Sequence, residues 1–327
     1  MIETFEGKQV LIAGASGLIG SNLVDSLMAA DAKVTVLGRS KVKMEKCFSM
    51  YAQNKNFSIV EHDIAKPLQN VAVYDCIFHA AGSMERDIVL NRPVEVVTPN
   101  ILGTINLLES MRNSGNASQR LILFSSVTVY NNTTSEDLVV SESDTMAATS
   151  LDAPTASYAE SKRMTEVIAK SYFKQYGIDV VIARFSTVYG VPRVVPNTAF
   201  FEFINKASRS EDIVLNGSNF ARRDNIYMSD AVNGLLTVAT KGQTGESYNI
   251  SCGGEKGNYS AVDEIAQVIA NCVAKHKNDK PVNVITKETT KRNPGLILDN
   301  SKLKSLGWDL KVDIKEGIQR TINELNK

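Results

Sequence analysis

The feature that most constrains this chain is a strand, a glycine turn and a helix in direct succession near its N-terminus. The apolar run 10–13 is short enough to be a buried strand, Gly14, Gly17 and Gly20 follow it, and apolar residues recur at helical spacing over 23–28. Gly14 allows a tight turn, Gly17 lets the backbone approach a pyrophosphate, and Gly20 lets the helix pack closely on the strand. The helix N-terminus offers unpaired N–H groups and the positive end of a dipole. The stretch therefore predicts a dinucleotide site.

Length and charge limit the number of domains and the kinds of partner that this sequence allows. With 327 residues the chain predicts one large domain and a smaller annex. The 36 basic and 36 acidic residues cancel, which argues against broad binding to nucleic acid or to an anionic membrane. No apolar run approaches the roughly 18 residues that span a bilayer, and the N-terminus has no signal-peptide pattern. We expect a cytoplasmic protein.

The cysteines and histidines do not form a recognisable metal site. The four cysteines stand far apart without a C-x-x-C pair and predict reduced, mostly buried thiols: Cys47, Cys76, Cys252 and Cys272. His79 lies in a strand and is expected to be a packed core residue, while His62 and His276 have no neighbouring ligands. We expect no metal.

Strands and helices alternate through the first part of the chain. Strands are predicted at 10–13, 33–37, 57–61, 75–79, 121–125 and 179–184, and long helices at 93–111 and 158–176. This alternation predicts an α/β fold of the Rossmann type, with a doubly wound parallel sheet covered on both faces.

The regular alternation of predicted strands and helices ends at about residue 186. We predict a dinucleotide-binding domain over 1–186, with later segments at about 226–250 returning to it. Segments 187–225 and 251–327 are expected to form a smaller, partly discontinuous C-terminal domain that binds substrate. The ligand crevice should lie between the two, at the carboxyl ends of the strands.

Three residues are candidates for proton chemistry. Tyr158 and Lys162 are four residues apart on a helix, so both side chains share one face. A neighbouring ammonium stabilises a phenolate and allows Tyr158 to act as an acid or base well below its usual pKa of about 10. Ser126 ends a strand and emerges at the same sheet edge as the glycine turn, where it can bond the same substrate oxygen.

Together these motifs resemble the extended short-chain dehydrogenase/reductase family, in its nucleotide-sugar epimerase/dehydratase group. The glycine pattern, HDI, HAAG, the asparagine element at 100–104, SSVTVY, YAESK, ARFSTVYG and RRDNIYMSD occur in that family's order over nearly the whole length.

The resemblance implies site residues at matching positions. Ser126, Tyr158 and Lys162 match the catalytic Ser/Thr–Tyr–Lys triad. Positions expected to hold the cofactor are Gly14, Ser16, Gly17, Leu18, Ile19, Gly20, Gly38, Arg39, Ser40, Asp63, Ile64, Ala80, Ala81, Gly82 and Asn100, with Tyr158 and Lys162. Expected substrate-binding positions are Ser126, Thr187, Arg223 and Arg292, the last beside Lys291 in a stretch that is shortened relative to the family.

Three departures from the family's pattern refine these expectations. Gly38, followed by Arg39, stands where an acid usually holds the adenine ribose of NAD, which favours NADP(H) slightly over NAD(H). Arg39 stacked on the adenine of NAD is the alternative. Val127 and Thr128 replace the acidic residues that dehydratases and decarboxylases carry after the catalytic hydroxyl. Thr187 replaces a common asparagine, which leaves the bound sugar open.

The expected activity is NAD(P)-dependent redox chemistry at C4 of a nucleoside-diphosphate sugar. A 4-epimerase and a 4-keto-reductase are nearly equal candidates, because both need only hydride and proton transfer at one carbon. The alternatives are a 4-dehydrogenase, a 4,6-dehydratase-like enzyme and a non-catalytic NAD(P)-sensing protein. A homodimer is expected from the resemblance alone, through the helices 93–111 and 158–176, although burial against the chain's own sheet explains the same apolar pattern.

Overall fold

The structure is a computed structural model of the chain. It describes residues 2–68, 73–82, 85–130, 136–144, 148–195, 198–215, 222–255, 257–286 and 294–326.

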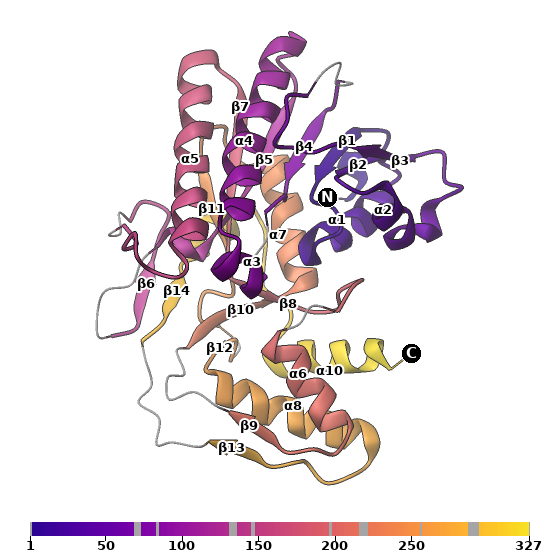
Figure 1. Cartoon of the computed structure of the whole chain (residues 1–327), viewed down its shortest axis with the longest axis vertical. Coiled ribbons are helices and arrows are strands. Elements are labelled where there is room, and N and C mark those ends of the chain that lie inside the picture. The colour runs from indigo at the N-terminus through magenta and orange to yellow at the C-terminus, as the bar shows by residue number, and fades with distance from the viewer. Residues whose placement is uncertain are drawn as a thin grey trace.

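A seven-stranded parallel sheet forms the centre of the molecule (Figure 1). Its order is β11-β7-β5-β4-β1-β2-β3. The strands are β1 (Gln9–Ala13), β2 (Lys33–Gly38), β3 (Phe57–Glu61), β4 (Cys76–His79), β5 (Arg120–Ser126), β7 (Asp179–Phe185) and β11 (Ser247–Ile250). The order reverses beside β1, which is the doubly wound topology that the sequence predicts, and the Rossmann-type fold is confirmed.

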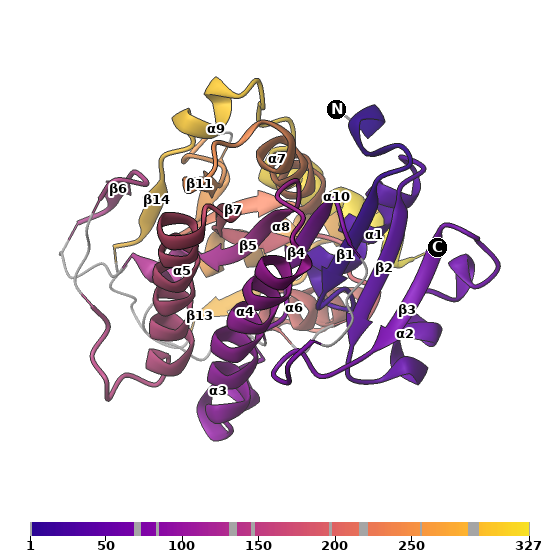
Figure 2. The ribbon, with the colours of Figure 1, turned by 90° about the horizontal axis from the view of Figure 1, so that it is seen from above.

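Helices cover both faces of this sheet because its strands are apolar on both sides. The helices α1 (Leu18–Met28) and α7 (Met228–Lys241) share one core with the sheet. On the other face α4 (Val94–Ser114) and α5 (Ala156–Tyr176) pack side by side and close a second core (Figure 2). Both long helices end at a left-handed glycine, Gly115 and Gly177.

A smaller lobe lies below the carboxyl ends of the strands in Figure 1. Its helices α6 (Ala199–Ser208), α8 (Val262–Lys277) and α10 (Ile314–Leu325) share a separate core. Two small sheets belong to this region: β8 (Thr187–Tyr189) with β10 (Arg223–Tyr227) and β12 (Tyr259–Ser260), and β9 (Ile213–Leu215) with β13 (Val284–Thr286). Helix α7 and strand β11 return to the main sheet and its core. The domain limits at 186 and 251 stay a prediction.

Short elements depart from the sequence-based expectation. Strand β6 (Leu138–Val140) is not among the strands that the sequence predicts, and it pairs in parallel with β14 (Leu296–Leu298). The other short elements are η1 (Ile2–Phe5), α2 (Lys41–Cys47), η2 (Ser49–Tyr51), α3 (Arg86–Asn91), η3 (Val127–Val129) and α9 (Ser301–Ser305). Among the described helices, none is both long and apolar enough to cross a membrane.

Candidate active site

The backbone turn after β1 leaves a hollow, called the glycine cradle below, because its key positions are glycines. Side chains at Gly14 and Gly20 would collide with the neighbouring backbone. Gly14 has φ +84°, and a Cβ there would stand 2.6 Å from the backbone carbon of Ala80. A Cβ on Gly20 would stand 2.6 Å from the carbonyl oxygen of Gly14. Gly17 caps α1 with backbone alone, so the first N–H groups of this helix face an exposed, anion-accepting edge. The cradle therefore fits the pyrophosphate of a dinucleotide.

The next edge of the cradle lies at the end of β4. Gly82 has φ +152°, and a Cβ there would lie 2.5 Å from Oδ1 of Asn100 and 3.6 Å from Nζ of Lys162. Asn100 is buried in α4, and its Nδ2 donates to Oγ of Ser161 over 2.8 Å. Its Oδ1 has no partner among the described residues. This buried acceptor beside an exposed glycine fits a polar group of a bound ligand.

The parallel sheet brings the three candidate catalytic residues together. Ser126 ends β5, and its Oγ caps η3 by accepting a hydrogen bond from the backbone N–H of Thr128. Tyr158 lies in the first turn of α5 and shares a side-chain hydrogen bond with Ser126. Nζ of Lys162 lies 5.9 Å from the centre of the Tyr158 ring and donates to the carbonyl of Phe124 over 2.8 Å.

Burial controls the ionisation of this group. It raises the pKa of Tyr158 to about 12, against the opposite effect of the hydrogen bond with Ser126. It lowers the pKa of Lys162 to about 8, against the opposite effect of Glu166. The expectation that Lys162 lowers the tyrosine pKa is therefore wrong for this arrangement. The physical reason is that the Lys162 ammonium bonds the Phe124 carbonyl while the phenol is enclosed by apolar side chains.

His79 lies in the buried end of β4. Its Nδ1 has no partner among the described residues, and burial, followed by the charge of Lys162, lowers its pKa to about 3. It is therefore a neutral core side chain near the site, as the sequence predicts. Within the described ranges, no three His, Cys, Asp or Glu side chains gather around a possible metal position.

The corner after β2 contains a residue that the sequence analysis missed. Gly38 ends β2, Arg39 is exposed, and Oγ of Ser40 caps α2 by accepting from the backbone of Lys43. Glu61 ends β3 directly opposite Gly38, and its carboxylate accepts from the backbone N–H of Lys41 over 2.8 Å. A carboxylate from the neighbouring strand thus stands at the corner where β2 itself has none. Its position at the end of the predicted strand 57–61 was the available signal.

The remaining predicted cofactor positions lie along the same sheet edge. Oδ1 of Asp63 accepts from the backbone of Ala65, and the buried Ile64 packs 3.1 Å from the Cβ position of Gly103. Side chains that are half-buried around the turns after β1 and β4 are Ser16, Leu18, Ile19, Ala80 and Ala81.

Apart from Ser126, which ends β5 in the main sheet, the predicted substrate-binding residues that are described lie on the smaller lobe. Thr187 pairs with Asn225 in the β8–β10 register, and Arg223 precedes Asn225 by two residues, so these side chains share one face of the small sheet. Arg223 is exposed, whereas Arg222 packs over Tyr259. Arg292 and Lys291 lie outside the described residues.

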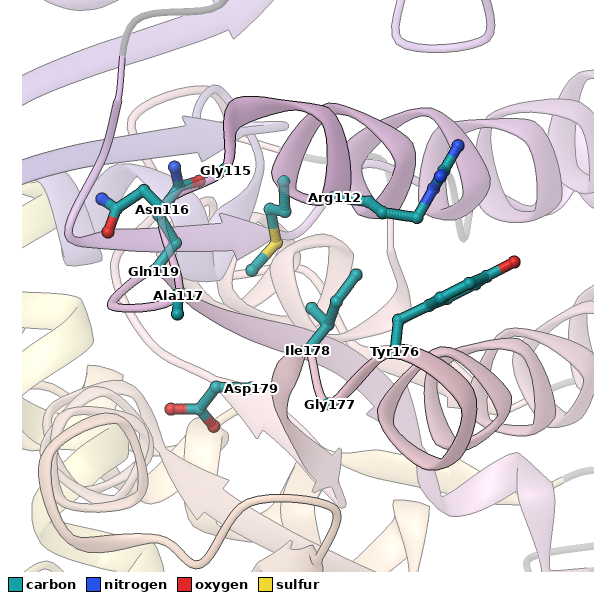
Figure 3. A pocket seen from close by; sticks show the side chains of 10 residues that line it. Arg112, Gly115, Asn116, Ala117, Gln119, Tyr176, Gly177, Ile178 and Asp179 are labelled. Atoms are coloured by element: carbon teal, nitrogen blue, oxygen red, sulfur yellow. The ribbon is translucent and has the colours of Figure 1, made fainter.

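A pocket at the opposite edge of the sheet does not include any predicted site residue (Figure 3). It lies where α4 and α5 end and where β5 and β7 begin, between Arg112, Tyr176 and Asp179. This hollow is separate from the candidate active site, because parallel strands place their carboxyl ends at the other edge.

Comparison with known proteins gives a family match. The sequence model described as "NAD dependent epimerase/dehydratase family" matches residues 10–251. The chain is 28% identical to dTDP-D-glucose 4,6-dehydratase of Mus musculus, over 98% of this chain and 89% of that protein. It is 29% identical to UDP-glucuronic acid decarboxylase 1 of Danio rerio, over 98% of this chain and 73% of that protein.

A solved structure shares the fold. The enzyme WbmF of Bordetella bronchiseptica, in complex with NAD+ and UDP, superposes with a TM-score of 0.76 at 22% identity. The match covers 99% of this chain and 93% of that one.

Proposed function

We propose, on the premise that this chain belongs to the NAD dependent epimerase/dehydratase family, that it performs redox chemistry at C4 of a nucleoside-diphosphate sugar. Membership confirms the family expected from the motifs and makes the chain an NAD-dependent enzyme of the extended short-chain dehydrogenase/reductase type. The observation that carries the proposal is the meeting of Ser126, Tyr158 and Lys162 beside the glycine cradle. The enzyme is a 4-epimerase or a 4-keto-reductase.

Each of the three residues has a distinct role in this proposal. A bound nicotinamide dinucleotide supplies hydride acceptance and donation. Tyr158 takes the proton of the C4 hydroxyl when the ketone forms and returns it when the ketone is reduced. Ser126 donates a hydrogen bond to the same oxygen, and the ammonium of Lys162, which lies 3.6 Å from the Cβ position of Gly82, would bind the nicotinamide end of the cofactor beside the cradle.

The positions after Ser126 argue against elimination or decarboxylation. Removal of water needs an acid and a base beside the leaving group. Val127 and Thr128 carry no carboxyl group, and the Thr128 hydroxyl is buried without a partner among the described residues. The mouse and zebrafish relatives are a dehydratase and a decarboxylase. We propose that this chain shares the oxidation at C4 with such enzymes and lacks their later steps.

For the cofactor we propose NAD(H). The family is NAD dependent and WbmF binds NAD+. The carboxylate of Glu61 stands opposite Gly38 and repels a 2′-phosphate, whereas Arg39, which favours NADP(H) in the sequence, is exposed. Gly14, Gly17 and Asn100 would hold the pyrophosphate and the nicotinamide end.

We also propose that the enzyme is a cytoplasmic homodimer. Apolar side chains are exposed on the adjacent helices α4 and α5, at Val94, Val97, Leu102, Met164 and Val167. A group of exposed apolar side chains on two adjacent helices is typical of a protein interface. The free thiols Cys47, Cys76, Cys252 and Cys272 suit a reducing compartment.

Incubation with UDP-sugars and dTDP-sugars, in the presence of NAD(H) or NADP(H), tests the proposed activity. Product analysis by NMR, together with the absorbance of reduced nicotinamide, separates the candidates. A C4 epimer without net reduction indicates the epimerase, and consumption of reduced cofactor on a 4-keto sugar indicates the reductase. Accumulating keto sugar indicates a 4-dehydrogenase. Loss of water or carbon dioxide contradicts the proposal, and so does cofactor binding without any turnover, which defines a sensor.

A further inference from the structure

A buried ion pair lies directly behind the candidate catalytic residues. Glu166 follows Lys162 by one turn of α5, and its carboxylate faces Arg184 of β7. Nε of Arg184 donates to Oε1 over 2.9 Å and Nη2 donates to Oε2 over 2.6 Å. Only 9% of the Glu166 side chain and 11% of the Arg184 side chain are exposed. A two-pronged contact of this kind fixes both position and orientation of the carboxylate.

The same carboxylate is bonded to the strand that carries Ser126. Oγ of Ser125 donates to Oε1 of Glu166. Ser125 stands between Phe124, whose carbonyl accepts from Lys162, and Ser126, which bonds Tyr158. Glu166 therefore contacts β5 at Ser125, between the residue that bonds Lys162 and the residue that bonds Tyr158.

Arg184 extends the contact to the segment after Ser126. Its Nη1 donates to the hydroxyl of Tyr130 over 2.6 Å and to the carbonyl of Glu142 over 3.1 Å. The Tyr130 hydroxyl donates to Oδ1 of Asn249 in β11 over 2.9 Å. The network thus connects the end of β5 to β7 through Arg184. It also connects the turn after Ser126 to β7 and β11 through Tyr130.

We propose that Glu166 is a positioning residue for the reaction: held by Arg184 and Ser125, its carboxylate fixes the end of β5 and keeps the ammonium of Lys162 in its working place and charge state. This proposal rests on the proposed function for the role of Lys162. The contacts within the network stand independently of it.

The charges around Lys162 define the expected pH effect. Lys162 is faced by Tyr158 from the same helix, α5, and by the neutral His79 from β4. Arg184 of β7 faces Glu166, with Tyr130 and the backbone of Glu142 behind it. Burial lowers the pKa of Lys162 and Glu166 opposes that effect. Loss of the Glu166 charge therefore lowers this pKa further, and Lys162 loses its proton at a lower pH.

The first experiment compares kcat/KM against pH for the wild type and the Glu166→Gln variant. We expect the alkaline limb of the variant to move to lower pH by about half a unit or more, with a loss in kcat of about tenfold. Asp179→Asn is the matched control, because Asp179 pairs with Arg120 over 2.8 Å at the opposite ends of the same two strands. The control should leave the limb in place. A Glu166→Gln limb that coincides with that of the wild type overturns the proposal.

Two further variants keep the proposal testable if Glu166→Gln folds poorly or if the wild type turns over no sugar. Ser125→Ala keeps the ion pair and removes one bond to the carboxylate, so we expect a several-fold lower kcat with an unmoved limb; wild-type kcat contradicts the positioning role. A double-mutant cycle of Glu166→Gln with Lys162→Met, read by denaturant unfolding, needs no activity. We expect a coupling of at least about threefold in the unfolding constant. Absence of coupling overturns the link between the two residues, whereas an inactive wild type contradicts only the proposed function.

Discussion

At the scale of single residues, burial sets the charge states on which the candidate chemistry depends. Tyr158 and Lys162 are both almost fully buried, and each is shifted toward its neutral form. The i, i+4 spacing predicts their proximity, but not the direction in which the Lys162 ammonium points. That direction depends on the Phe124 carbonyl, which belongs to a distant part of the sequence.

Replacing Lys162 by Met should stabilise the fold while abolishing turnover. The pKa of Lys162 is lowered from 10.5 to about 8, so below pH 8 the folded state carries the cost of a buried cation. Between pH 8 and 10.5 the unfolded state binds more protons, and this cost disappears as the pH rises. We expect Lys162→Met to raise the free energy of unfolding by about 1 to 3 kcal/mol at pH 7, and by progressively less toward pH 10.5. Urea unfolding at several pH values measures this, and a destabilised variant at pH 7 would contradict it.

The corner of β2 and β3 gives a prediction about cofactor choice. Glu61→Gln removes the carboxylate opposite Gly38, so the affinity for NADP+ should rise about threefold or more while that for NAD+ changes little. Fluorescence titration with both dinucleotides measures the ratio. Glu85→Gln is a control at another surface acid, and an unchanged ratio in Glu61→Gln would show that Glu61 does not select the cofactor.

At the scale of elements, the glycine turn makes a stability prediction with an internal control. Gly14→Ala adds a Cβ at φ +84° against the backbone of Ala80, whereas Gly115→Ala adds one at φ +67° with nothing within 4 Å. We expect Gly115→Ala to cost only the left-handed backbone term of about 1 to 2 kcal/mol. Gly14→Ala should cost more than this and should lose dinucleotide binding. Equal unfolding free energies, with cofactor binding retained, would contradict the close approach of the two turns.

The long elements could be predicted from the sequence, and the short ones could not. The apolar runs of β1, β2 and β5 carry their own signal, and the helices α4 and α5 show helical spacing over 21 residues each. Strand β6 has three residues, and its partner β14 lies more than 150 residues further along the chain. Its stability comes from that pairing and from a small apolar cluster with Tyr130, neither of which is local in the sequence.

The residues of the candidate site also fall into a group that could be predicted from the sequence and a group that could not. Ser126, Tyr158 and Lys162 could be predicted because they lie in local motifs at the ends of regular elements. Glu166 and Arg184 were missed, because a buried ion pair between a helix and a strand gives no signal until the two elements are packed.

At the scale of the whole molecule, the exposed apolar faces of α4 and α5 predict the assembly. Val167 is 58% exposed on α5, and Val167→Glu places a charge in the proposed interface. We expect sedimentation equilibrium to show a dimer for the wild type and a monomer for this variant. Val42→Glu is the control, since Val42 is 76% exposed on α2, at the far side of the sheet from α5 (Figure 2). A wild type that sediments as a monomer contradicts the proposed homodimer.

The most direct measurement of the proposed chemistry is the turnover of the Tyr158→Phe variant with a nucleotide sugar that the wild type converts. Loss of the phenol hydroxyl should reduce kcat by at least about 100-fold, while the affinity for the dinucleotide stays within about twofold of the wild type. Wild-type turnover in Tyr158→Phe would contradict the assignment of proton transfer to this residue, and with it the proposed mechanism.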